Sequence, residues 1–143
     1  MSHNWIPLRR VGCFEFGSGI ADCIGTHHLV EIPEEYNETV GWKVYRSPGD
    51  DNIRIFSENG EVVSVACYDE CLYQGVNLIG LSLEEFVQVV GSQPLAQPDT
   101  ILVDDGPQKV FEFDDVEAQV WVKDEKVVTV FCGTRDEHEE KEA

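Results

Sequence analysis

KVVTVFC, at residues 126–132, nearly repeats EVVSVAC, at residues 61–67. The likeness extends backwards without a gap, because NIRIFSENGEVVSVAC (52–67) aligns on EAQVWVKDEKVVTVFC (117–132). Each of these longer stretches holds two alternating, strand-like runs on either side of a polar turn. The sequence therefore predicts two matching β-hairpins.

The two predicted turns differ in composition. Asn59-Gly60 lies in the first, and Asn-Gly between strand-like runs is a strong hairpin signal. Asp124-Glu125 takes the same place in the second. The second turn is thus predicted from its match to the first.

A helix-like stretch precedes each hairpin, and each closes on a glycine. Residues 79–91 read IGLSLEEFVQVVG, where Ser82 and Glu85 have the spacing of a capping box and Gly91 suits a C-cap. Residues 16–25 read FGSGIADCIG, which is shorter and contains an internal glycine. We expect a full helix before the second hairpin and a brief one before the first.

Four more strand-like runs separate the helices from the hairpins: HLVEI (28–32), GWKVYR (41–46), TILVD (100–104) and QKVFEF (108–113). We therefore predict an α+β fold of two tandem repeats, each a helix packed on a four-stranded antiparallel sheet. The expected divisions are an N-terminal segment 1–10, a first repeat 11–68, a linker 69–78, a second repeat 79–133 and an acidic, disordered tail 134–143.

The chain is strongly acidic, with 28 Asp and Glu residues against 10 Lys and Arg residues and a formal net charge of -18. Such a charge repels nucleic acid and anionic membranes, so we expect neither as a partner. It speeds encounter with a basic protein. The alternative explanation is solubility alone, because net charge bears on association and not on fold.

The five cysteines are odd in number and show no tight pairing pattern, which favours reduced thiols and a cytoplasmic location. No apolar run has the length of a membrane helix, and the first residues lack the apolar centre of a signal peptide. Cys67 and Cys132 occupy the same place in the matched hairpins. We expect both to be reduced and buried in equivalent core positions.

Candidate metal and catalytic groups are few. The His27-His28 pair near Cys23 allows a zinc site, but neighbouring histidines in a strand point to opposite faces, which favours a loop. Cys67 and Cys71 allow a redox or metal role, but buried structural thiols explain them better. The sequence has no Ser-His-Asp order and no P-loop. We therefore expect no enzyme activity, no metal and no cofactor.

Acidic pairs recur at the ends of predicted strands: Asp50-Asp51, Asp69-Glu70, Asp104-Asp105 and Asp114-Asp115. Paired carboxylates can bind Ca²⁺ or serve acid–base chemistry, but no pair has the spacing of a calcium loop. Turn formation and solvation are the preferred explanation. Some of these carboxylates remain candidates for contact with a basic partner.

Strand alternation predicts one face rich in aromatic residues. If Val63 and Cys67 pack toward the helix, then Val62, Ser64 and Ala66 face away. The matching positions of the other strands join that open face. The alternative is that loops or the other half of the chain cover it. As candidate partner-binding residues on and around this face we select Tyr45, Arg54, Phe56, Glu112, Gln119, Trp121 and Phe131, with Asp104, Asp105, Asp114 and Asp115 at its edges.

Short motifs recur in both halves of the chain. The second half has Gly80-Leu81-Ser82, Glu84-Glu85-Phe86, Gly91 and Lys126-Val127-Val128, and the first has Phe16-Gly17-Ser18, Gly25 and Glu61-Val62-Val63. In their order these motifs resemble the repeat of β-lactamase inhibitor protein and its structural relatives, among them small outer-membrane assembly lipoproteins. The resemblance covers about residues 11–133 and implies the tandem fold predicted above.

Two departures from that family narrow the target that the resemblance implies. The β-lactamase inhibitor is secreted and disulfide-bonded, and the lipoproteins begin at a lipid-bearing cysteine, whereas neither pattern occurs here. The small, acidic, cytoplasmic profile is similar to that of immunity proteins, which neutralise bacterial toxins by binding them. We therefore expect a non-enzymatic inhibitor of a toxin or effector enzyme. The alternatives are an assembly or ligand-binding module, or a small enzyme that uses a groove between the halves.

Overall fold

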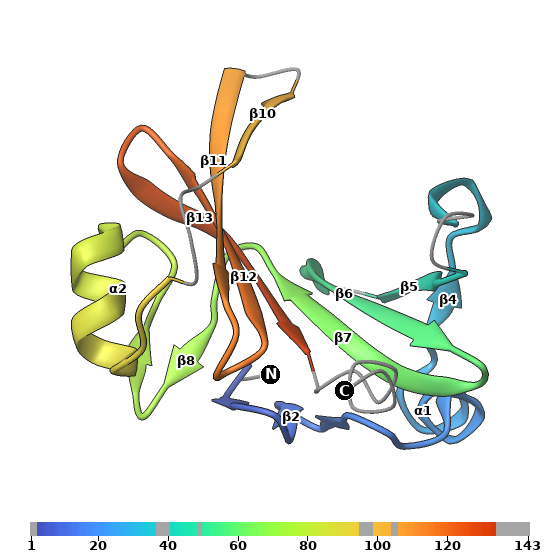
Figure 1. The fold of residues 1–143 in the computed structure, drawn as a ribbon. Helices are drawn as coiled ribbons and strands as arrows, with labels where there is room; N and C mark the ends of the chain where they lie inside the picture. The colour runs from blue at the N-terminus through green and yellow to red at the C-terminus, as the bar shows by residue number, and fades with distance from the viewer. Residues whose placement is uncertain (1–2, 37–40, 49, 95–98, 104–105, 134–143) are drawn as a thin grey trace, which may run out of the picture.

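The computed structural model describes residues 3–36, 41–48, 50–94, 99–103 and 106–133. Within these residues the chain forms one eight-stranded antiparallel sheet, one three-stranded sheet and a two-stranded hairpin, with two α-helices of eight residues each (Figure 1). No described helix is long and apolar enough to cross a membrane. The chain is thus built mainly from strands.

The large sheet takes its strands from both halves of the chain, in the order β10-β11-β12-β13-β7-β6-β5-β4. The first half supplies β4 (Val30–Glu31), β5 (Lys43–Ser47), β6 (Asp50–Glu58) and β7 (Glu61–Cys67). The second half supplies β10 (Asp99–Val103), β11 (Gly106–Phe113), β12 (Ala118–Lys123) and β13 (Lys126–Gly133). Each of the four strand-like runs therefore contains a strand, although in the run 28–32 only Val30 and Glu31 belong to it.

The prediction of an α+β fold with two repeats, each a helix on its own four-stranded sheet, was wrong. Strand β13 pairs with β7 in antiparallel register, from Val130 opposite Cys67 to Gly133 opposite Ser64, so that all eight strands form a single sheet. The physical reason is that two separate sheets would each leave a long strand edge with unpaired backbone groups. Pairing the last strand of each half removes both edges.

The two predicted hairpins are confirmed, and their registers agree. Ile55 pairs with Val65 in β6–β7, and Val120 pairs with Val130 at the matching place in β12–β13. Each hairpin also has a bulge after its outer aromatic residue, Phe56 or Trp121. The matching sequences thus fold to matching backbones, including their irregularity.

Both expected helices are present. Helix α2 (Leu83–Val90) has the predicted capping box between Ser82 and Glu85, and it ends at Gly91 in the left-handed conformation. Helix α1 (Ile20–His27) runs past Gly25, which therefore does not close it as expected. His28, at φ 56°, takes the left-handed position after its last turn.

Short strands in the remaining segments complete the fold. The N-terminal sheet consists of β1 (Trp5–Ile6), β2 (Arg10–Val11) and β3 (Phe14–Glu15). Residues 69–78, expected as a linker, contain the hairpin of β8 (Leu72–Tyr73) and β9 (Val76–Asn77). A 3₁₀ turn, η1 (Pro33–Glu35), follows β4. The expected tail, 134–143, lies outside the described residues.

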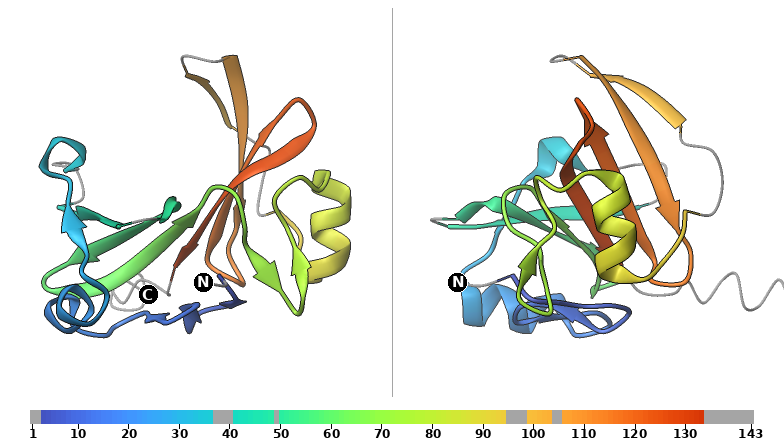
Figure 2. Two further views of the ribbon diagram at one scale, coloured as in Figure 1. Left: turned by 180° about the vertical axis from the view of Figure 1, so that it is seen from behind. Right: turned by 90° about the vertical axis from the view of Figure 1, so that its left-hand side faces the viewer.

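One hydrophobic core serves the whole chain. The small sheet contributes Phe14, helix α2 contributes Phe86, and the large sheet contributes Val65, Val120 and Val130 to the same cluster of buried side chains. Figure 2 shows β1–β3 and α1 lying under β6 and β7, with α2 beyond the other end of the small sheet. The core therefore occupies one face of the large sheet, and the described helices leave the opposite face open.

Candidate functional site

A row of four aromatic rings crosses the open face of the large sheet. The ring centroids lie 5.7 Å apart between Trp42 and Phe56, 6.0 Å between Phe56 and Phe131, and 5.8 Å between Phe131 and Trp121. Each distance is within the range in which tilted aromatic pairs attract. All four side chains are only partly buried. We call these residues the aromatic row.

Small side chains on β7 allow the aromatic row to form. Ala66 lies opposite Phe131 of β13, and Ser64 lies opposite Phe56 of β6. Because these two side chains are short, the rings on either side close over them, and Ala66 and Ser64 are 0 % and 5 % exposed. Ser64 also donates a hydrogen bond to the carbonyl of Cys132 at 2.8 Å. The centre of the face is therefore apolar at its surface, and the Ser64 hydroxyl beneath it has a hydrogen-bond partner.

Polar groups hold one end of the aromatic row. The indole Nε1 of Trp121 donates to Oε1 of Gln119 at 2.8 Å. The amide of Gln119 then donates to Oε1 of Glu112 at 2.7 Å. This chain of hydrogen bonds fixes the plane of the Trp121 ring while leaving Glu112 exposed. A ring held in one orientation loses less conformational entropy when a partner covers it.

A second polar group lies on the same face, along β6. Arg54 forms an ion pair with Glu35 of η1, with 3.8 Å between Nε and Oε1. Tyr68 lies beside them, because its backbone N–H donates to Asn52 and so extends the pairing of β7 with β6. Partial burial raises the pKa of Tyr68, Arg54 opposes the rise and Glu35 adds to it. The three side chains therefore share one electrostatic environment.

Six of the predicted partner-binding residues lie together on this face: Arg54, Phe56, Glu112, Gln119, Trp121 and Phe131. The expected position of Tyr45 was wrong. It lies opposite Ile55, is 4 % exposed and belongs to the core on the other face. Asp114 and Asp115 are exposed in the turn after β11, where Asp115 accepts a hydrogen bond from the Ser92 hydroxyl. Asp104 and Asp105 lie outside the described residues.

The expected inward position of Val63 was also wrong. Val62 is fully buried and Val63 is half-buried, the reverse of the predicted order. The bulge after Phe56 adds one residue to β7 and shifts the alternation from Val63 onward toward the turn. Ser64 and Ala66 lie beyond the bulge and keep the predicted face.

Trp42 and Tyr68 belong to the face and were missed by the sequence argument. For Tyr68 the signal was present, since continuing the alternation from Ser64 and Ala66 by one step reaches it. Trp42 lies just before β5, and its ring contact with Phe56 is not encoded in any strand pattern. An aromatic residue just outside a strand, such as Trp42, could therefore be assigned to the face only from the structure.

The cysteines agree with the expectation of free, buried thiols. Cys67 lies opposite Ile53, Cys132 lies opposite Ala118 at the matching place, and neither sulfur is in a disulfide. Both residues are 0 % exposed, and so is Cys71. The proposed zinc ligands around His27 do not converge. In the part of the chain that the structure describes, only Cys67, Cys71 and Cys132 bring potential metal-ligand atoms together.

Comparisons with known proteins do not narrow the function of this face. No protein-family model matches the chain, and neither the curated proteins nor the solved structures gave a match.

Proposed function

We propose that this protein acts by binding, and that the open face of its large sheet docks a second protein and inhibits it without catalysis by this chain. The aromatic row is the observation that supports this proposal. Its rings are half-buried on a face that neither described α-helix covers, so a partner can bury apolar area that is now partly in contact with water. Tryptophan anchors are typical of the centres of protein interfaces.

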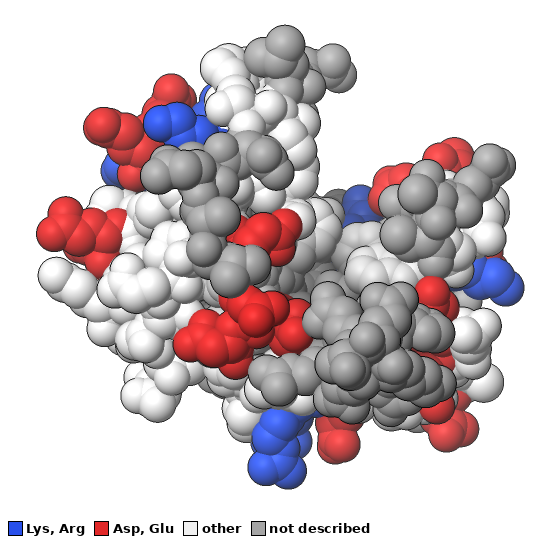
Figure 3. All heavy atoms as spheres, in the orientation of Figure 1, with Lys and Arg blue, Asp and Glu red and all other residues white. Residues whose placement is uncertain are grey.

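Charge favours a basic partner. The chain carries a formal net charge of -18. Glu112, which Gln119 links to Trp121, is exposed, and so is Asp114 in the turn after β11. Figure 3 shows acidic side chains gathered over the turn between β11 and β12. On this face Glu35 partly offsets Arg54, and Arg46 of β5 lies opposite Arg54. A basic surface would therefore be steered toward the Trp121 end of the face, an effect that salt should weaken.

The partner that we favour is a toxin or effector enzyme that this protein neutralises in the cytoplasm. This choice is supported by the acidic composition, the reduced thiols and the sequence resemblance to inhibitor proteins described above. In this proposal the aromatic row supplies affinity, and the exposed carboxylates of Glu112 and Asp114 increase the rate of association.

The experiment is to capture the partner from the producing cells with the tagged wild-type chain, and then to measure affinity with the purified partner. Trp121→Ala should weaken binding by about 2 kcal/mol or more, which is roughly 30-fold, because it removes the anchor of the aromatic row. The association rate of the wild type should fall as ionic strength rises.

Tyr73→Ala is the matched control. Tyr73 is also a half-buried aromatic residue in a ring pair, 5.9 Å from Trp5, but it belongs to β8 and not to the large sheet. Its removal should leave affinity unchanged. If Trp121→Ala folds normally by circular dichroism and binds as tightly as the wild type, the open face is not the interface. If the partner keeps full activity in the complex, the protein is an assembly module and not an inhibitor.

A further inference from the structure

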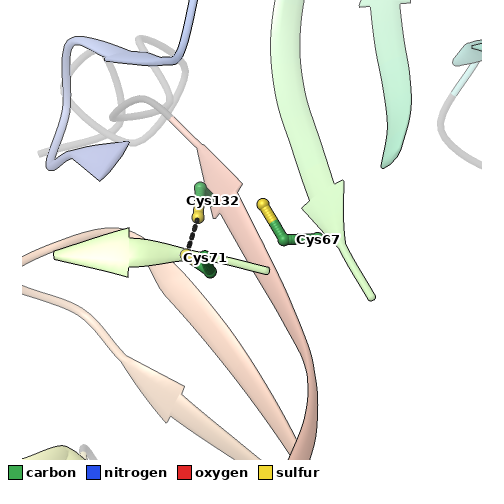
Figure 4. A group of neighbouring side chains, drawn as sticks. All are labelled: Cys67, Cys71 and Cys132. Atoms are coloured by element: carbon green, nitrogen blue, oxygen red, sulfur yellow. Dashed lines mark hydrogen bonds between the residues drawn. The ribbon is translucent and has the colours of Figure 1, made fainter. Parts of the chain in front are cut away.

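Three cysteine side chains meet inside the core, on the face opposite the aromatic row. Cys67 ends β7, Cys71 directly precedes β8, and Cys132 lies in β13 (Figure 4). Their Sγ atoms all lie within 4.8 Å of one another, and those of Cys71 and Cys132 are 4.0 Å apart. Figure 4 shows the three side chains pointing toward a common centre.

The topology explains why the sulfur atoms converge. Strands β7 and β13 pair so that Val130 faces Cys67 and Cys132 faces Val65, which makes the two cysteines diagonal neighbours on one face. The hairpin of β8 and β9 brings the third. The Cys71 N–H donates to Oδ1 of Asn77 at 3.0 Å, and the Cys71 carbonyl accepts from the N–H of Leu78 at 2.8 Å. All three thiols are thus held by hydrogen-bonded backbone.

The spacing of the sulfur atoms suits one metal ion. Zinc–thiolate bonds are about 2.3 Å long, so three sulfur atoms around one ion lie about 4 Å apart. The Cys71–Cys132 distance already has that value, at 4.0 Å, and the others are within 4.8 Å. Small side-chain rotations would therefore complete the geometry. Thiolate sulfur selects soft ions such as Zn²⁺ and Cu⁺.

Packing alone is a weaker explanation for this cluster. A single buried cysteine commonly fills core space, and Cys23, buried in the core apart from the cluster, is an example. Here three thiols contact one another instead of aliphatic carbon alone. The Sγ atoms of Cys71 and Cys132 lie 4.0 Å apart, and all three Sγ atoms lie within 4.8 Å of one another. One shared ion would account for the convergence of all three thiols.

We propose that Cys67, Cys71 and Cys132 form a trithiolate site that binds one soft metal ion of the Zn²⁺ or Cu⁺ class. Binding forms three sulfur–metal bonds and releases the three thiol protons to solvent, with no change of oxidation state. The residues are 0 % exposed, so a substrate could not reach the ion, and its role would be structural. It would join β7, β13 and the segment before β8, the place where the two halves of the chain meet.

Cadmium is a suitable probe, because Cd²⁺ is a soft ion whose bonds to thiolates absorb in the ultraviolet. The protein is reduced, stripped of metal under denaturing conditions, and refolded with increasing Cd²⁺. We expect a charge-transfer band that saturates at one ion per chain, and that Zn²⁺ or Cu⁺ displaces. Because Cys67, Cys71 and Cys132 are all 0 % exposed, Cd²⁺ added to the folded apo-protein should reach them much more slowly than Cd²⁺ present during refolding.

Cys71→Ser and two matched controls complete the test. Loss of one thiolate should weaken Cd²⁺ binding at least tenfold, since even loss of a supporting residue around a metal costs about 10–100-fold. Cys13→Ser removes an exposed thiol and Cys23→Ser removes a buried thiol outside the cluster, so both should bind like the wild type. Cd²⁺ should raise the melting temperature of the wild type and of both controls, but not that of Cys71→Ser.

Two results would overturn the proposal. One is a wild-type chain that refolds correctly with Cd²⁺ present and shows no charge-transfer band. The other is an equal band in Cys71→Ser, which would place the ion elsewhere. If Cys71→Ser fails to fold even with metal, native mass spectrometry of the wild type decides, since the proposal requires one bound ion per chain and a chain without bound ion contradicts it.

Discussion

The β6–β7 and β12–β13 hairpins share register, bulge position and buried cysteine, yet most of their side chains differ. Ile55 in the first corresponds to Val120 in the second, Phe56 corresponds to Trp121, and the Asn59-Gly60 turn corresponds to Asp124-Glu125. The shared features lie at the backbone and the core. The differences show how much side-chain change one backbone tolerates when the pairing of the strands is kept.

Substitutions on the two faces of these hairpins should have different effects. On the core face, Ile55 and Val120 are both 0 % exposed and pack in one cluster. On the open face, Phe56 and Trp121 are half-buried and contact Phe131 from opposite sides. We therefore expect substitutions in the core to lower stability most, and substitutions on the open face to affect partner binding more than folding.

The largest effect on stability is expected for Ile55→Ala. It leaves a cavity in the centre of the core and should lower the free energy of unfolding by about 2–5 kcal/mol. The matching Val120→Ala deletes one methylene fewer, so its cost should be smaller by about 1 kcal/mol. Urea unfolding monitored by circular dichroism measures both. Equal costs would show that the two hairpins are not packed equivalently.

Mutations of the N-cap residue should change the free energy of unfolding differently in the two helices that precede the hairpins, by about 1 kcal/mol. Ser82 accepts the N–H of Glu85 at 3.1 Å, so Ser82→Ala should cost about 1 kcal/mol. Gly19, which caps α1, makes no side-chain hydrogen bond, and a Cβ there would meet only Asp22 at 3.7 Å. Gly19→Ser should therefore gain a few tenths of a kcal/mol. A stabilised Ser82→Ala would contradict the observed capping box.

The same cap has a pH dependence of known sign. The backbone N–H of Ser82 donates to the Glu85 carboxylate at 3.0 Å, and this lowers the pKa of Glu85 below its ordinary value. The contribution of the ionised carboxylate is complete above the ordinary Glu pKa and is lost as pH falls through the lowered one. Glu85→Gln should remove this part of the pH dependence. Unfolding curves of both proteins across the acidic range measure it.

Coupling within the aromatic row should be about 0.5–1.5 kcal/mol for each contacting pair. A double-mutant cycle with Trp121→Leu and Phe131→Leu measures one contact, at 5.8 Å, and a cycle with Phe56→Leu and Phe131→Leu measures the other, at 6.0 Å. We expect similar values from the two cycles. Coupling near zero in both would mean that the rings are neighbours without stabilising one another, and the row would not be preorganised for a partner.

Much of the local structure could be predicted from the sequence. Alternation and the matched stretches located both hairpins, and the Ser82–Glu85 spacing located α2 with its cap. These features depend on residues near one another in the chain. The joining of β13 to β7 depends on backbone groups of two strands far apart, whose side chains carry no signal of that pairing. The fold class was wrong for this reason.

The sequence also predicted part of the candidate site correctly. Phe56 and Trp121 were assigned to the open face because they occupy matching positions. Tyr45 was misplaced because alternation cannot tell which face of a separate strand joins which, and only its pairing with Ile55 decides. The cysteine cluster was missed because Cys71 follows β7 through a chain reversal that no motif marks.

The smallest effect concerns the two turns. Both residues of each turn have positive φ: 53° and 81° at Asn59 and Gly60, and 51° and 67° at Asp124 and Glu125. That backbone suits glycine, whereas a residue with a side chain is strained by about 1–2 kcal/mol there. Glu125→Gly relieves this strain but adds freedom to the unfolded chain, which costs about 0.5–1 kcal/mol, so a net gain of about 0.5 kcal/mol is expected. The converse change, Gly60→Ala, should lose a similar amount. Thermal unfolding of both variants tests the pair, and a destabilised Glu125→Gly would show that the Glu125 side chain makes a contact worth more than the strain.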